Sequence, residues 1–273
     1  MNPLLTVIGI SAAAAAAALL AWGNRAITTS EYAVASPAVP RSFDGLRIAQ
    51  ISDLHNDPFG KSYCSLVKAV QAAKPHLIVI TGDMLDARRT NIPRALEAAQ
   101  ALLTIAPCCY VKGNHEARNP QYPIFEAGLR EAGVHVLRRE NRVLNRGNGH
   151  LTIIGIDCPY GDDSYPAYLY ELAAQAEGFT LLLAHHPEPF DTYCKAGVDL
   201  ALCGHTHGGQ LRLPFIGGVI APHQGFFPKY DAGLYERGKT KMIISRGLGN
   251  SLFPLRINNR PELVVVELRR EEA

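Results

Sequence analysis

Five short clusters of Asp, Asn and His residues constrain this 273-residue chain more than any other feature. Each cluster directly follows an apolar run. In sequence order the clusters are Asp53-Leu54-His55, Gly82-Asp83, Gly113-Asn114-His115-Glu116, His185-His186-Pro187 and Gly204-His205-Thr206-His207. Open α/β sheets bind ligands in the crevice beyond the carboxyl ends of their strands. The clusters therefore predict that several strands deliver these side chains to one site.

The donor atoms in these clusters are carboxylates, a carboxamide and imidazoles, with no cysteine among them. Such donors suit hard or borderline divalent ions. Asp53 and His55 are two residues apart, so on an extended backbone they share one face, and His205 and His207 repeat this spacing. One such motif alone is more often a cap or a turn. All five in this order predict a two-metal hydrolase.

Composition predicts one large α/β domain, which we place at residues 31–273. With 47% hydrophobic residues the chain can bury a sizeable core. The net charge of +2 and the absence of a dense Lys/Arg stripe argue against a nucleic-acid partner. The sequence leaves the oligomeric state open.

The six cysteines show no CxxC spacing and mostly lie in or beside apolar runs. We interpret them as small buried hydrophobic residues, although an even count permits disulfides. Intact thiols fit a reducing compartment better. These residues are Cys64, Cys108, Cys109, Cys158, Cys194 and Cys203.

The N-terminal segment predicts a membrane anchor over residues 1–24, followed by a short linker at 25–30. Residues 3–22 carry no charge, and a helix of about 20 residues would cross a hydrocarbon core of roughly 30 Å. A cleaved signal peptide is the alternative. Arg25 after the apolar run favours a cytoplasmic side for the domain.

Past the anchor, strands and helices alternate in a βαβ rhythm, which then changes to closely spaced strands typical of a hairpin or second sheet. Two packed sheets flanked by helices are the simplest architecture. The expected strands are 46–52, 77–81, 108–112, 134–137, 142–146, 151–157, 179–184, 200–203, 242–245 and 263–268. The expected helices are 63–74, 92–104 and 122–132.

The order of the five clusters resembles the calcineurin-like metallophosphoesterases, from about Tyr32 to the C-terminus. The resemblance implies a four-layer α/β sandwich of two mixed sheets flanked by helices. It also implies two divalent ions, manganese first, with iron, zinc or magnesium as alternatives. In that family the first ion is held by Asp53, His55 and His207, the second by Asn114, His185 and His205, and Asp83 bridges both.

The same resemblance implies a reaction. A hydroxide that bridges the two ions attacks phosphorus in line, and His115 acts as the acid that protonates or stabilises the leaving oxygen. Paired ions a few Å apart lower the pKa of water and neutralise charge on a phosphoryl oxygen. We therefore expect a metal-dependent phosphoric ester or pyrophosphate hydrolase, with His115 and Asp83 as its catalytic residues.

A narrower resemblance rests on Gly204 to Gln210, on Ser245 to Gly249 and on Pro254-Leu255-Arg256. These stretches look like the membrane-anchored bacterial branch of YkuE- and YaeI-like phosphodiesterases, which is related to UDP-2,3-diacylglucosamine hydrolases of lipid A synthesis. This resemblance implies a location at a bacterial inner membrane, where a lipid-linked substrate would explain a membrane anchor.

Four further residues are expected to contact substrate. Arginine offers a bidentate fork for phosphate, which nominates Arg118 and Arg246. His186 is expected to line the pocket or pack behind it, and His223 to lie at the pocket rim. Glu116 is expected either to orient His115 or to face water at a helix N-terminus.

Other functions remain open at this stage. Within enzymes they are a broad-specificity phosphodiesterase, a phosphoprotein phosphatase and a cyclic-nucleotide phosphodiesterase. A catalytically inactive scaffold is disfavoured because every expected ligand position is filled.

Overall fold

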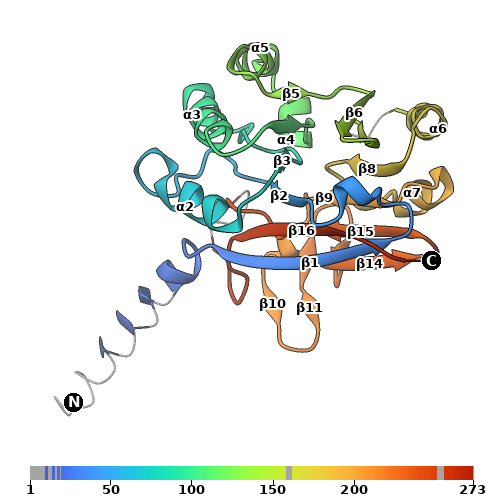
Figure 1. The fold of residues 1–273 in the computed structure, drawn as a ribbon. Helices are drawn as coiled ribbons and strands as arrows, with labels where there is room; N and C mark the ends of the chain where they lie inside the picture. Colours follow the sequence, from blue (N-terminus) through green and yellow to red (C-terminus); the bar gives the residue numbers. More distant parts are fainter. Residues whose placement is uncertain are drawn as a thin grey trace.

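Two six-stranded mixed β-sheets form the centre of the protein (Figure 1). The computed structural model describes residues 10–11, 14–15, 17–18, 20–157, 162–250 and 255–272. Cys158 and Pro254, which the sequence analysis considered, lie outside these residues.

The first sheet has the order β1-β16-β2-β3-β4-β5. Its strands are parallel except for the antiparallel pair of β16 and β2. The bounds are β1 Thr28–Ser36, β2 Arg47–Ile51, β3 Leu77–Ile80, β4 Cys108–Tyr110, β5 His135–Val136 and β16 Glu262–Arg270.

The second sheet has the order β14-β15-β9-β8-β7-β6, with parallel strands at its centre and an antiparallel pair at each edge. The bounds are β6 Glu140–Arg146, β7 Gly149–Gly155, β8 Phe179–Leu183, β9 Leu200–Cys203, β14 Gly233–Arg237 and β15 Thr240–Ile244. Two small hairpins follow β9: β10 Arg212–Leu213 with β11 Gly217–Gly218, and β12 Ile220–Ala221 with β13 Gly225–Phe226.

Helices cover the outer face of each sheet. One apolar cluster joins the first sheet to α2, α3 and α5, and another joins the second sheet to α6 and α7. The helices are α2 Cys64–Ala73, α3 Ile92–Leu103, α4 Asn114–Ala117, α5 Tyr122–Ala132, α6 Tyr165–Ala174 and α7 Phe190–Ala196, with 3-10 turns η1 Arg41–Phe43, η2 Lys61–Tyr63 and η3 His207–Gly209. A third cluster fills the space between the sheets. The predicted α/β architecture of two mixed sheets flanked by helices is therefore confirmed.

Helix α3 shows how the sequence forms these layers. Asn91 caps its N-terminus by accepting a hydrogen bond from the backbone N–H of Arg94. Its buried residues recur three and four positions apart, as an amphipathic helix requires. They are Ala95, Ala98, Ala99 and Leu102.

Most predicted elements are present, and the differences are informative. The expected strands at 142–146 and 151–157 are the hairpin of β6 and β7. Helices α6 and α7 and strands β1 and β14 were not predicted from the sequence. Of the six cysteines, the five within the described residues are free thiols.

The described residues before β1 lead away from the two sheets (Figure 1). No helix found among the described residues is both long enough and apolar enough to cross a bilayer. The predicted anchor at 1–24 includes positions 1–9, 12–13, 16 and 19, which lie outside the described residues. Strand β1 begins at Thr28, so the last three residues of the predicted linker at 25–30 belong to the sheet.

Glu116 joins the loops that follow β3 and β4. Its carboxylate is fully buried and accepts backbone hydrogen bonds from Asp83 at 2.8 Å, Leu85 at 2.8 Å and Gly113 at 3.0 Å. Burial, together with the charge of Asp83, raises the pKa of Glu116 to about 8. Glu116 therefore does not face water, and that expectation is wrong, whereas its role in orienting His115 stays a prediction.

We predict that Glu116→Gln lowers the free energy of unfolding by about 1–3 kcal/mol, because the new amide N–H₂ faces backbone donors. Urea unfolding of both proteins measures this difference. Glu97→Gln, on the exposed side of α3, is the matched control and should change stability little. Equal stability of the two variants would contradict the role of Glu116.

Candidate metal centre

The loops after β2, β3, β4, β8 and β9 meet at the carboxyl ends of these strands. Backbone bonds tie them in pairs: the N–H of Asp53 donates to the carbonyl of Gly82, and that of Gly204 donates to the carbonyl of His185, both at 3.0 Å. Across the two sheets, the N–H of His205 donates to both carboxylate oxygens of Asp53. The fold therefore brings the loops of the five clusters together at one edge, as predicted from the sequence.

Two of the cluster glycines are required by close packing. A Cβ at Gly82, whose φ is +89°, would lie 2.6 Å from the backbone nitrogen of Gly113. A Cβ at Gly204 would overlap the side chains of Ser52 and Asp53. These glycines thus let the loops approach one another closely enough to bring their side chains together.

Five of the expected ligand residues have a left-handed backbone conformation. This conformation is uncommon outside glycine, and strain of this kind is concentrated at functional sites. The φ values are 52° at Asp53, 49° at His55, 53° at Asp83, 72° at His205 and 49° at His207. The surrounding structure therefore holds these side chains in place against a local preference for other conformations.

Asp53, His55 and His207 form the first cluster of donor atoms. The Nε2 atoms of His55 and His207 are 3.1 Å apart, and Asp53 Oδ1 lies 3.5 Å from His207 Nε2 and 3.9 Å from His55 Nε2. All three side chains are buried. The Ser52 hydroxyl donates to Asp53 Oδ2 at 2.6 Å, which fixes the carboxylate.

His185, Asp83, His205 and Asn114 form the second cluster. His185 Nε2 lies 3.2 Å from Asp83 Oδ2 and 3.1 Å from the amide head of Asn114, which is 2.7 Å from His205 Nδ1. His185 Nδ1 donates to the carbonyl of Thr81 at 2.7 Å. This hydrogen bond directs Nε2 toward the other donors, as is usual for metal-ligating histidines.

Asp83 lies between the two clusters. Its Oδ2 atom is 3.2 Å from His185 Nε2 in the second cluster and 3.8 Å from His55 Nε2 in the first. Its Oδ1 atom accepts a hydrogen bond from the backbone N–H of His115 at 2.8 Å. One carboxylate thus faces both groups of donors.

Burial keeps most of these imidazoles in the neutral form that binds metal. Desolvation lowers the pKa of His55 to about 3 and holds the pKa of His205 and of His207 well below the usual range. Desolvation also raises the pKa of Asp53 to about 6, with the nearby Asp83 charge adding to the shift and His185 opposing it. Divalent cations would compensate these buried carboxylates, so the donor set fits two such ions.

His185 behaves differently from the other imidazoles. Burial alone would lower its pKa, but the Asp83 carboxylate, and then Asp53, raise it to about 10. A cation in the second cluster must therefore displace a proton from this ring.

His115 lies beside both clusters. Its ring centroid is 4.5 Å from that of His55, and its Nδ1 accepts a hydrogen bond from the backbone N–H of Ala87 at 3.1 Å. The neutral ring then carries its proton on Nε2. Burial lowers the pKa of His115, although Asp83 and Asp86 oppose this shift.

A cavity of about 250 Å³ opens over both clusters. Among the residues expected to contact substrate, the exposed Arg118 and His223 line it. His223 Nδ1 is 3.0 Å from His205 Nε2. The lining residues are Asp83, Asn114, His115, Arg118, His205, His207, Gln210, Pro222 and His223.

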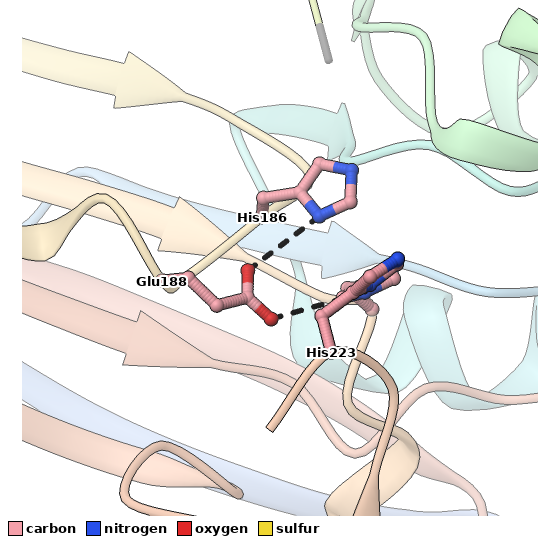
Figure 2. Close-up of side chains that lie close together, drawn as sticks. His186, Glu188 and His223 are labelled. Carbon is pink, nitrogen blue, oxygen red and sulfur yellow. Dashed lines mark hydrogen bonds and ion pairs between the residues drawn. The ribbon is translucent and has the colours of Figure 1, made fainter. Parts of the chain in front are cut away.

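His186 packs behind the second cluster beside Glu188. Figure 2 shows the carboxylate of Glu188 directed toward the rings of His186 and His223. Glu188 lies 3.5 Å from His186 Nδ1 and 3.8 Å from His205 Nε2. Glu188 was not predicted from the sequence, although its position three residues after the ligand His185 was a usable signal.

Arg246 does not line this cavity. Its guanidinium forms an ion pair with Glu262 at 3.0 Å and borders a separate cavity near Trp22. Its expected contact with substrate has no support in the structure. The buried Arg256, which the analysis treated only as part of a motif, instead approaches the site, with its Nη2 3.4 Å from His207 Nδ1.

Asp86 is a second carboxylate that the sequence analysis missed. It lies 3.9 Å from His115 Nδ1 and caps the turn that contains Ala87. Its position three residues after Asp83 was the only signal in the sequence.

Comparisons with known proteins agree with this geometry. A model of the family described as calcineurin-like phosphoesterase matches residues 46–209. The metallophosphoesterase YkuE of Bacillus subtilis (strain 168) is 32% identical over 96% of this chain and 95% of its own length. The phosphodiesterase YaeI of Escherichia coli (strain K12) is 32% identical over 81% of this chain and 82% of its own length.

More distant matches extend the comparison. A protein of Bos taurus named transmembrane protein with metallophosphoesterase domain is 28% identical over 98% of this chain and 63% of its own length. The solved structure of TT1561 of Thermus thermophilus covers 75% of this chain and 90% of that chain, with a TM-score of 0.51 and 13% identity, and so shows a shared fold alone.

The family match spans more than half of the chain, and YkuE is similar along nearly all of it. Clusters of buried His and Asp residues lie at the loops that the family model covers. The chain therefore belongs to the calcineurin-like phosphoesterase family and is a metal-dependent phosphoester hydrolase.

Proposed function

We propose that the protein hydrolyses a phosphodiester or pyrophosphate in a lipid-linked substrate, using two divalent ions. Asp53, His55 and His207 would hold the first ion, and Asn114, His185 and His205 would hold the second. The observation that carries the two-metal reaction is the position of Asp83, whose single carboxylate faces donor atoms of both clusters within one cavity.

When bound, the two ions supply an activated water and neutralise charge on the phosphoryl group. Manganese is our first choice, because oxygen and imidazole donors without thiolate suit it. The rest of the reaction falls to side chains of this chain. Arg118 lies exposed at the cavity, where its guanidinium binds non-bridging phosphate oxygens.

His115 acts on the leaving oxygen. Its Nδ1 is occupied by the Ala87 N–H, so Nε2 is the atom that donates a proton. Asp83 positions this ring by accepting the backbone N–H of His115. His223 and Glu188 hold the His205 ring from the side opposite the second cluster.

The lipid-linked substrate, for which UDP-2,3-diacylglucosamine is the first choice, is supported by the apolar N-terminus. Residues 3–22 carry no charge, and we propose that this segment anchors the chain to a bacterial inner membrane with the domain on the cytoplasmic side. An anchor raises the local concentration of a substrate embedded in the same bilayer.

The test is a product assay on the full chain in mixed micelles, metal-stripped and then supplied with Mn²⁺. UDP-2,3-diacylglucosamine is compared with a generic water-soluble chromogenic phosphodiester. Release of UMP far above generic turnover supports the lipid-linked substrate. Turnover of the generic diester alone retains the two-metal reaction and excludes this substrate, whereas turnover of neither contradicts the whole proposal.

We predict that Asp83→Asn lowers bound metal below two ions per chain and lowers turnover by roughly 100-fold or more, because it removes the shared carboxylate. Elemental analysis and the chromogenic assay measure the two effects. Asp163→Asn, at an exposed position, is the control and should keep both. Two retained ions with full turnover in Asp83→Asn would show that Asp83 does not bridge.

We predict that His115→Ala lowers turnover of an alkyl diester by about 10²- to 10⁴-fold but affects a nitrophenyl diester much less. The reason is that a good leaving group needs no proton, whereas an alkoxide does. Metal content should stay at the wild-type value. An equal loss on both substrates would rule out a role at the leaving oxygen.

A further inference from the structure

Two hairpins beside the cavity expose an unusual concentration of large apolar side chains. Phe215 is completely exposed at the tip of the β10–β11 hairpin, and Phe226 is 73% exposed in β13. Exposed apolar patches on a protein surface mark interaction sites. The apolar rim, as we call this group, consists of Leu213, Phe215, Ile216, Ile220, Phe226 and Phe227.

The backbone holds these side chains outward. Phe215 has a φ of 65° and Phe227 a φ of 53°, both in the left-handed region that bulky residues rarely adopt. The carbonyl of Val219 accepts a hydrogen bond from the N–H of Phe227, and the N–H of Val219 donates to the carbonyl of Leu211, both at 2.8 Å, so Val219 joins the second hairpin to the first. The apolar rim is therefore built by the fold and does not result from a loose loop.

A chain of contacts connects the first hairpin to the segment that precedes β1. The N–H of Arg212 donates to the carbonyl of Ile257 at 3.1 Å, which joins β10 to the 255–260 segment. In that segment Arg256 exchanges backbone hydrogen bonds with the side chain of Asn24, and Arg260 stacks on Trp22 at 4.6 Å. In Figure 1 the described residues before β1 and the β10–β11 hairpin extend toward the lower side of the view.

The apolar rim itself carries little charge. Residues 211–230 include no Asp or Glu, and Arg212 within them is paired with Asp231 at 2.9 Å. Lys229 beside the rim is exposed, and so is Arg25, which follows the helical residues 20–23. A surface that combines aromatic side chains with exposed cations is complementary to an anionic bilayer surface.

We propose that the apolar rim docks on the anionic bilayer surface, with Phe215, Ile216 and Phe226 inserted at the headgroup boundary. This inference rests on the proposed membrane anchor and deepens it, because it assigns a second membrane contact to the catalytic domain itself. Pro222 and His223 lie between β12 and β13 and also line the cavity. Docking therefore brings the cavity to the depth at which the phosphate of a lipid-linked substrate lies.

Depth-dependent fluorescence quenching tests the proposal directly. The chain has one tryptophan, so Phe215→Trp in a Trp22→Phe background creates a single reporter at the tip of the rim. The full-length variant is reconstituted into phosphatidylethanolamine and phosphatidylglycerol vesicles whose acyl chains are brominated. Ile124→Trp in the same background is the matched control, because Ile124 is 65% exposed on α5, on the opposite side of the molecule (Figure 1).

We expect the reporter at 215 to shift to shorter wavelength and to lose roughly half or more of its emission, while the reporter at 124 changes little. Equal behaviour of the two reporters in vesicle-bound protein would overturn the proposal. Failure of the full chain to bind vesicles would overturn it too. Shielding of the reporter at 215 in the absence of vesicles would also overturn it, if sedimentation showed that the protein associates with itself.

A second variant links docking to turnover. Phe215→Ser with Ile216→Ser should lower hydrolysis of a vesicle-embedded substrate by about tenfold, while turnover of the soluble diester stays unchanged and shows that the variant folds. Equal rates of wild type and variant on the vesicle substrate would contradict the proposal. The quenching readout does not depend on hydrolysis, so failure of docking and failure of the proposed reaction can be told apart.

Discussion

Asp53 and Asp83 place two carboxylates at the junction of the two sheets, where 2% or less of either residue is exposed. Buried charges of this kind are costly unless they are paired or coordinate metal. Backbone N–H groups of His205 and His115 satisfy part of the demand, and the surrounding imidazoles satisfy more. Bound divalent cations would compensate the remaining negative charge. The neighbouring loops place their donor atoms where such cations would lie.

Bringing these buried side chains together constrains the backbone in two ways. Five ligand residues adopt left-handed backbone conformations, and two glycines are present because no Cβ fits. Glu116 offsets part of the cost of these constraints by accepting three backbone N–H bonds from two of the loops. Glu116, which is not expected to contact substrate, therefore holds the loops of the site together.

The catalytic domain presents two different surfaces near the cavity. The cavity itself is lined by polar and charged groups, whereas the hairpins at its edge expose aromatic and aliphatic side chains. A substrate with a phosphorylated head and apolar chains would match both. The reaction and the membrane contact are thus proposals about adjoining parts of one surface.

The sequence by itself determined the α/β class, most strands and the order of the ligand clusters, because buried strands and helices have local periodicities. It also determined the chemistry of the donor set, which depends only on residue type. Only the tertiary structure decided that Arg246 pairs with Glu262, that Arg256 approaches His207, and that Glu188 lies beside His205. These outcomes depend on contacts between segments far apart in the chain, which no local pattern records.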